Sequence, residues 1–236
     1  MQQSFSIDQA QTQIQVNSFI RSVYNWMSIG LAITGLVAFF VSNNATLQSL
    51  IFGTPLFYVL IFAELGLVWT ISARVRTNRM QASTATGLFM LYAGLNGATL
   101  SAILLMYASA TVAQAFFITA ATFFACSVYG MVTKKDLTGV GQFMFMGLIG
   151  IVIATIANIF FRSSGLQMII SYLGVFIFVG LTAYDTQKLK MMALTQPADL
   201  DGATIQKGAI LGALTLYLDF INMFIFIVHI LGGSRD

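Results

Sequence analysis

The feature that most constrains this chain is a series of seven apolar segments, each long enough to cross a lipid bilayer. They lie near residues 23–42, 53–73, 82–107, 111–132, 140–161, 167–188 and 208–231. A helix needs about 20 apolar residues to span the hydrocarbon core. Because lipid offers no partner to an unpaired backbone group, runs of this length form helices rather than strands. We therefore predict an all-α integral membrane protein with seven transmembrane helices.

Polar sequence is confined to the ends of the chain and to the connections between spans. Residues 1–22 form a polar N-terminal lead-in, residues 23–232 hold the seven spans, and residues 233–236 are a short tail. Only 8% of residues are charged, against about 25% in soluble domains, so we expect one transmembrane domain and no separate soluble one. The lead-in lacks the basic region of a cleaved signal peptide, so we expect the first span to remain as an anchor.

Lysine and arginine accumulate in alternate connections, and this bias predicts the orientation. Cytoplasmic loops of membrane proteins carry the excess of positive residues. Of the 11 Lys and Arg residues, all except Arg162 and Arg235 fall on the side of the predicted spans that includes Arg21. We predict a cytoplasmic N-terminus and a C-terminus on the outer side.

Composition argues against several classes of function. The formal net charge is only +3 and is scattered, so we expect no nucleic-acid partner. Cys126 is the only cysteine and His229 the only histidine, so one chain cannot form a disulfide or a Cys/His zinc site. We expect Cys126 to be a small packed residue, and His229 to pack or to lie at the membrane interface. No loop carries a phosphate-binding motif, and we expect no cofactor.

Small residues recur at four-residue spacing in two of the spans. Ala93, Gly97 and Ser101 form one set, and Gly208 and Gly212 form another. Small residues at this spacing let helix backbones approach closely. We expect the contacts to be within the chain rather than between copies of it.

Three acidic residues inside or at the edge of the spans are the leading functional candidates. They are Glu64 in the second span, Asp185 at the end of the sixth and Asp219 in the seventh. A charged group at mid-membrane is costly, by about 2.5–3.5 kcal/mol on insertion scales, so such residues face the protein interior and find a partner or a proton.

The two aspartates belong to consecutive spans that enter from the same side of the membrane. If their carboxyl groups meet away from water, repulsion between like charges leaves one proton shared by the pair. We predict that Asp185 and Asp219 form a proton-sensing pair, in which loss of the shared proton opens a path or admits a cation. Asn222, one turn after Asp219, can donate a hydrogen bond there and border the same path.

Glu64 is expected close to the middle of the membrane, where it can line a cation path or hold a second proton. Its alternative is a protonated side chain that bonds a neighbouring helix. Arg74 and Arg76 end the same span; either can pair with Asp185 as a latch, or both can act as ordinary cytoplasmic anchors.

The motifs around these residues resemble those of a known family. "GLTAYDTQKLK", "GALTLYLDFINMF" and "TKKDLTG", together with seven spans, are similar to the transmembrane Bax inhibitor motif family, especially its bacterial inner-membrane members. The resemblance implies six helices around a central seventh. It also implies a pH-sensitive calcium leak that is gated by a hydrogen-bonded aspartate pair, here Asp185 and Asp219, with Glu64 as the pore carboxylate.

Calcium passage, on this interpretation, is weak and transient. A tight calcium site needs six to eight oxygen ligands, and the few acids of the spans supply too few. The expected partners are therefore protons, calcium or other cations, and the lipid bilayer.

Other interpretations compete with the leak. A proton-coupled solute carrier would use the same acids as a relay. A regulatory protein would bind another membrane protein and could dispense with the aspartates. An intramembrane aspartyl protease also carries two aspartates on its sixth and seventh helices, but its second one follows a G-x-G-D pattern, whereas this chain reads "LYLD". We expect no enzyme.

Overall fold

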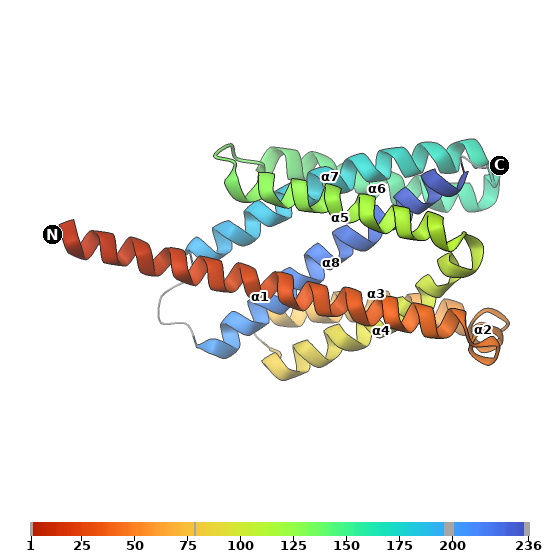
Figure 1. The fold of residues 1–236 in the computed structure, drawn as a ribbon, viewed down its shortest axis with the longest axis horizontal. Helices are drawn as coiled ribbons and strands as arrows, with labels where there is room; N and C mark the ends of the chain where they lie inside the picture. The colour runs from red at the N-terminus through yellow and green to blue at the C-terminus, as the bar shows by residue number, and fades with distance from the viewer. Residues whose placement is uncertain (1, 78, 196–200, 234–236) are drawn as a thin grey trace. The chain divides into compact units, whose positions relative to one another are not determined.

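The computed structural model describes residues 2–77, 79–195 and 201–233, with side chains from residue 14 onward. This described part of the chain contains eight helices and no strand (Figure 1). They are α1 (Gln2–Ser42), α2 (Ala45–Phe52), α3 (Leu56–Arg76), α4 (Ala82–Met106), α5 (Ser109–Val132), α6 (Thr138–Phe161), α7 (Ser164–Thr195) and α8 (Gly202–Gly233). All but α2 are long and apolar enough to cross a membrane. The prediction of seven transmembrane helices is therefore confirmed for the described residues.

The helices continue past the apolar segments from which they were predicted. Helix α1 begins at Gln2, so it includes the polar lead-in, and α7 and α8 extend several residues into the connection between them. Hydropathy marks only the part of a helix that suits lipid. Residues such as Lys, Gln, Leu, Met and Ala favour helix in water as well, so these helices end where the polar turns begin.

A short helix, α2, lies between the first two spans and was missed in the sequence. The side chain of Asn44 caps it by accepting a hydrogen bond from the backbone nitrogen of Leu47 at 3.1 Å. Pro55 then precedes the first residue of α3, because its fixed backbone angle suits a helix start and it has no N–H group to leave unpaired. With eight residues, α2 is too short to span the membrane and leaves no hydropathy signal of its own.

The helices form two compact units, each built from two stretches of chain. The first unit comprises Met1–Met106 and Lys190–Tyr217, and the second comprises Tyr107–Leu189 and Leu218–Asp236. Helices α7 and α8 contribute to both units. Of the seven spans, α8 is the most buried, at 61% of its apolar window against 6% for α3. An arrangement of six helices around a central seventh stays a prediction.

In the first unit, α1 packs along α4, and α3 packs on α4 as well (Figure 1). The predicted set of small residues on α4 makes the close approach possible. A Cβ at Gly97 would lie 2.6 Å from the backbone oxygen of Thr34 and 2.9 Å from Cβ of Val37, and Ala93 and Ser101 are fully buried. The prediction that this set packs within the chain is confirmed.

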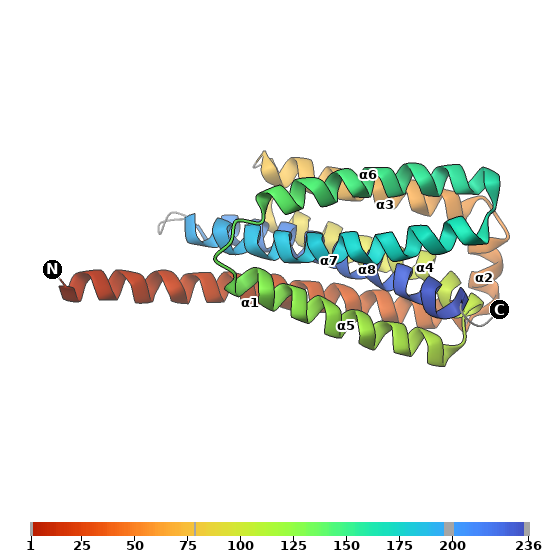
Figure 2. The same cartoon turned by 90° about the horizontal axis from the view of Figure 1, so that it is seen from above.

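In the second unit, α7 lies between α5 and α6 when the structure is seen from above (Figure 2). Gly130 on α5 faces the backbone at Ala183 and the side chain of Thr186, while Gly141 on α6 lies against the ring of Tyr184. Neither position has room for a Cβ. These contacts hold the segment of α7 that carries Asp185 between two helices.

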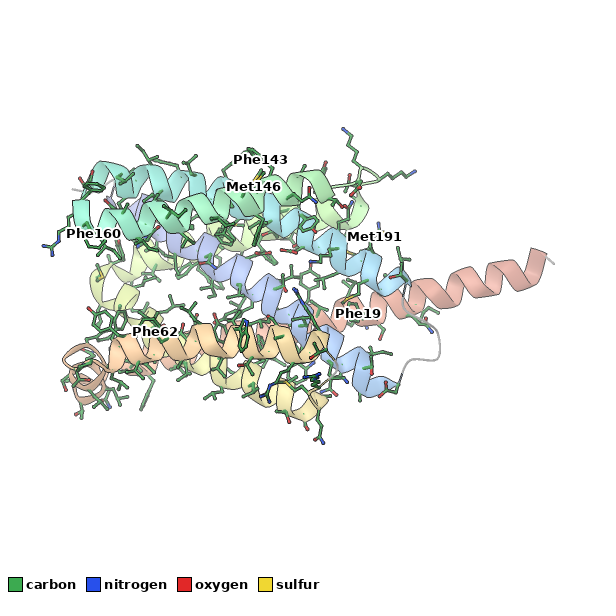
Figure 3. The ribbon with its side chains drawn as sticks, turned by 180° about the vertical axis from the view of Figure 1, so that it is seen from behind. Phe19, Phe62, Phe143, Met146, Phe160 and Met191 are labelled. Atoms are coloured by element: carbon green, nitrogen blue, oxygen red, sulfur yellow. The ribbon has the colours of Figure 1, made fainter. Side chains whose placement is uncertain are left out.

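Large apolar side chains cover the outer faces of both units. Phe62 on α3 is 72% exposed, and Phe143 and Phe160 on α6 are 63% and 80% exposed; all three point outward (Figure 3). A water-soluble protein rarely exposes so much apolar surface, whereas lipid covers it without penalty. The exposed faces therefore agree with a protein that lies in a membrane.

Candidate functional site

Asp219 lies in the middle of α8 and is only 4% exposed. Its Oδ2 atom is buried and has no hydrogen-bond partner among the described residues. A buried carboxyl oxygen without a partner is destabilising unless a proton, a water molecule or a cation satisfies it. Asp219 is therefore the most unusual polar group of the second unit.

Asp185 lies on α7, in the same unit as Asp219, and is partly buried. It is the ionisable group whose charge acts on Asp219. Because α7 continues to Thr195, Asp185 lies ten residues before the helix ends, or about 15 Å along the axis. The two aspartates thus interact electrostatically from neighbouring elements of one unit.

Two further buried oxygens of the second unit lack a hydrogen-bond partner among the described residues. They are the hydroxyl groups of Ser127 on α5 and Thr186 on α7. Thr186 follows Asp185 directly, and Gly130, which packs against Thr186, lies one turn after Ser127. Unsatisfied polar groups are rare in protein interiors, so their presence on three helices of one unit sets this region apart.

A side-chain amide joins the part of α7 near Asp185 to the connection between α5 and α6. The Oε1 atom of Gln187 accepts a hydrogen bond from the backbone nitrogen of Leu137 at 2.8 Å. Its Nε2 atom donates to the backbone oxygen of Lys135 at 2.7 Å. One residue further, the ammonium group of Lys188 lies 5.7 Å from the ring centre of Tyr184. The two bonds of Gln187 therefore hold this segment of α7 against the connection between α5 and α6.

Asn222 does not make the contact suggested by its spacing from Asp219. Its Nδ2 atom donates to the backbone oxygen of Leu218, one turn earlier on α8, at 2.8 Å. A side-chain amide in a helix can reach a backbone carbonyl of the preceding turn. Asn222 therefore does not satisfy the free oxygen of Asp219.

Glu64 lies on α3 in the first unit and is bound to α4 through both carboxyl oxygens. Asn96 Nδ2 donates to Oε2 at 3.0 Å, and Thr99 Oγ1 donates to Oε1 at 2.9 Å. These contacts agree with the alternative interpretation in its bond to a neighbouring helix, whereas the proton on Glu64 stays a prediction. The role of Glu64 in a cation path stays a prediction as well.

The hydrogen bonds of Glu64 continue into the centre of the first unit. The hydroxyl group of Tyr217, on α8, donates to Asn96 Oδ1 at 2.9 Å and lies 2.6 Å from Thr34 Oγ1 on α1. Tyr217 is fully buried, and its ring packs edge-on against Phe89 and Tyr92. The residues around Glu64 thus join side chains from α3, α4, α8 and α1.

Arg74 and Arg76 lie in the last turn of α3, and both side chains are exposed. Positive charges at this end of a helix are stabilised by the helix dipole, which agrees with a role as anchors. They belong to the first unit and Asp185 belongs to the second. The latch stays a prediction.

Cys126 and His229, the only cysteine and the only histidine, do not mark a metal site. Cys126 is partly buried, and His229 is partly buried on α8, with its ring centre 6.1 Å from that of Tyr107. Among the described residues, no group of three or more His, Cys, Asp or Glu side chains could hold a metal ion. A cation bound by a carboxylate here would therefore have few protein ligands.

The sequence did not single out the polar residues that surround these acids. Asn96 could have been noticed as a side-chain amide within the third span, and Tyr217 as the neighbour of the "LYLD" motif. No pattern in the sequence selected Thr34, Thr99 or Gln187. Isolated threonines in spans usually bond their own helix, and Gln187 stands among polar residues at the end of the predicted sixth span.

Comparison with known proteins identifies close relatives. The sequence profile of the family described as "Inhibitor of apoptosis-promoting Bax1" matches residues 16–236. The chain is 45% identical over 226 residues to the inner membrane protein YbhL of Escherichia coli K12, which covers 95% of each chain. A protein of Borreliella burgdorferi is 43% identical over 221 residues, covering 93% of this chain and 94% of the other. A protein of Deinococcus radiodurans is 42% identical over 234 residues, covering 99% and 98%.

Proposed function

This chain belongs to the Bax inhibitor-1 family, and on that premise we propose that it is a pH-sensitive cation leak gated by Asp185 and Asp219. The cation is most simply calcium. The membrane is the bacterial inner membrane, with the N-terminus in the cytoplasm, in line with the name of the Escherichia coli relative and with the distribution of Lys and Arg.

One observation carries the proposal: Asp219 is buried with a carboxyl oxygen that has no hydrogen-bond partner among the residues described, and the charge of Asp185 acts on it. Two carboxyl groups that interact in a poorly solvated place share one proton and titrate as a pair. At low pH the shared proton neutralises the pair. At higher pH the two carboxyl groups carry like charges that repel each other, so the helices separate or a cation enters.

The free hydroxyl groups of Ser127 and Thr186 support the same interpretation. Neither oxygen has a hydrogen-bond partner in the part of the chain that the structure describes, and oxygen is the ligand type that calcium prefers. Together with the two aspartates they supply at most six side-chain oxygens, which is the lower limit of the six to eight that a tight calcium site needs. A site of this kind favours passage over storage, which is the requirement for a leak.

The proposal is tested by calcium flux into proteoliposomes that hold the purified full chain, measured across pH. We expect flux to rise with pH in the native protein. Asp185→Asn and Asp219→Asn remove the titrating pair and should flatten the pH dependence. Asp136→Asn is the matched control, because Asp136 is an exposed residue in the connection before α6, and it should leave the profile unchanged.

Two results would contradict the leak. One is an absence of flux at every pH, and the other is an unchanged pH profile in both aspartate variants. Flux that depends on an added organic substrate and carries protons with it would indicate a solute carrier instead. Normal physiological activity with both aspartates replaced would favour a regulatory protein that binds another membrane protein.

A further inference from the structure

The hydrogen bonds around Glu64 form a continuous chain in which each member contacts the next. The order is Glu64 on α3, Asn96 on α4, Tyr217 on α8 and Thr34 on α1, with distances of 3.0, 2.9 and 2.6 Å. Thr99 joins it from the side, 2.9 Å from the other carboxyl oxygen. Every one of these groups can be assigned a donor or acceptor role, because a carboxylate only accepts and a tyrosine hydroxyl has a single proton.

With Glu64 ionised, every hydrogen bond of this series is donated in the direction of the carboxylate. Asn96 turns its NH₂ group to the carboxylate and its oxygen to Tyr217. The hydroxyl proton of Tyr217 is then used on Asn96, so Tyr217 accepts from Thr34. Thr99 donates to the second carboxyl oxygen, and no group of the chain is left without a partner.

With a proton on the carboxyl group, the same atoms form a complete chain in the opposite direction. The acid donates to the oxygen of Asn96 after its amide turns over, and the NH₂ group of Asn96 then donates to Tyr217. Tyr217 donates a hydrogen bond to Thr34. The hydroxyl group of Thr34 has two backbone acceptors at 2.9 Å, the oxygens of Gly30 and Ala93. These two carbonyl groups are therefore the end points that the reversed chain requires.

A proton on the oxygen that faces Thr99 is accommodated equally well. Thr99 then accepts from the acid and turns its own hydroxyl proton to the backbone oxygen of Asn96, which lies 3.0 Å away. A buried polar network is stable only when every member is satisfied, and this one is satisfied in both charge states.

We infer that Glu64 is a proton-binding site and that its occupancy sets the direction of the hydrogen bonds that reach α8 through Asn96 and Tyr217. Helices α2 and α4 pack on α3, and the only ionisable residue on either is Tyr92. The charge of Glu64 acts on the hydroxyl groups of Tyr92 and Tyr217. On α3 itself the nearest charges are Arg74 and Arg76, about 15 and 18 Å along the axis.

The consequence for α8 follows from the strength of the bonds. A hydrogen bond to a charged acceptor is roughly twice as strong as one between neutral groups, so protonation of Glu64 weakens the bonds from Asn96 and Thr99 that join α4 to α3. It also reverses the bond between Asn96 and Tyr217 on α8. Tyr217 lies two residues before Asp219 on the same helix. Glu64 thereby becomes a second proton sensor that acts on α8, whether or not the chain conducts cations.

Infrared difference spectroscopy of the full chain in lipid nanodiscs tests the inference without any flux measurement. The protein is titrated from about pH 9 to about pH 4, below the range in which tyrosine ionises. We expect a protonated-carboxyl band that is lost in Glu64→Gln. We also expect a change in a tyrosine C–O band at the same pH, lost in Tyr217→Phe and in Glu64→Gln but retained in the control Tyr92→Phe.

A pair of substitutions at Thr99 separates the hydrogen-bond effect from misfolding. Thr99→Val removes a donor to the carboxylate, so the carboxyl band should appear at a pH about one unit higher, whereas Thr99→Ser keeps the hydroxyl group and should match the native protein. The inference is overturned if Glu64→Gln loses no carboxyl band, if the tyrosine change persists in Glu64→Gln, or if Thr99→Val and Thr99→Ser titrate alike. Because these infrared measurements involve no transport, their outcome tests the role of Glu64 independently of the proposed leak.

Discussion

Substitution of Gly97 by alanine should loosen the packing of α1 on α4 within the first unit. The new Cβ would lie 2.6 Å from the backbone oxygen of Thr34, 3.1 Å from its Cα and 2.9 Å from Cβ of Val37. Backbone atoms of α1 cannot yield as the end of a flexible side chain can, so the helices must separate. Overpacking of this kind costs about 1–3 kcal/mol.

Gly94 provides the matched control on the same helix. It lies three residues before Gly97, and a Cβ built there meets nothing within 4 Å. Either substitution gains up to about 1 kcal/mol from the higher helix propensity of alanine, and this gain cancels in the comparison. We therefore expect Gly94→Ala to be neutral or slightly stabilising, and Gly97→Ala to be less stable than Gly94→Ala by about 1–3 kcal/mol.

Equilibrium unfolding in mixed micelles of a mild detergent and dodecyl sulfate, followed by circular dichroism, measures the difference. Gly97→Ala should unfold at a lower fraction of dodecyl sulfate than Gly94→Ala and the native chain. Equal unfolding midpoints for the two variants would refute the packing argument, because the new Cβ meets Thr34 and Val37 of α1 at position 97 and nothing within 4 Å at position 94.

Two further predictions concern single polar groups. Hydrogen bonds from the hydroxyl group and the backbone nitrogen of Thr138 lower the pKa of Asp136. The start of α6 should therefore be stabilised above the ordinary pKa of aspartate, near about 4, and should lose this stabilisation as the pH falls through the lowered pKa. Amide hydrogen exchange at residues 138–141 should show the loss in the native chain but not in Asp136→Ala. The backbone nitrogen of Ser163 donates to Asn158 Oδ1, Asn158 Nδ2 donates to Gln167 Oε1, and Gln167 Nε2 lies 3.4 Å from His229 Nδ1. His229 should therefore be neutral with its proton on Nε2, and ¹⁵N NMR of this single histidine at neutral pH would contradict the assignment by showing a protonated Nδ1.

The seven spans could be predicted from the sequence because the preference for lipid is local and adds along the chain. Each apolar run contains enough information to form a helix without knowledge of its neighbours. The same argument singled out Glu64, Asp185 and Asp219, since a carboxyl group within an apolar run is conspicuous wherever the run packs. Helix α2 was not predicted, because eight residues are too few for a segment that spans the membrane.

The partners of those acids could not be predicted. Spacing along α8 suggested that Asn222 serves Asp219, but its amide bonds the backbone of Leu218 instead. Nothing in the order of residues indicates that Asn96 and Thr99 bind Glu64, because a hydrogen bond between helices depends on how each helix is rotated and how far it is shifted along its neighbour.

The sequence alone therefore determined that this chain forms membrane-spanning helices and which of its charged groups are out of place in lipid. Tertiary structure decided which polar groups meet. It brought Tyr217 within 2.6 Å of Thr34, 183 residues away in the chain, and left Oδ2 of Asp219 without a partner among the described residues. The physical reason is one of range: transfer into lipid is a property of each segment, whereas a hydrogen bond forms only when two atoms lie within about 3 Å of each other.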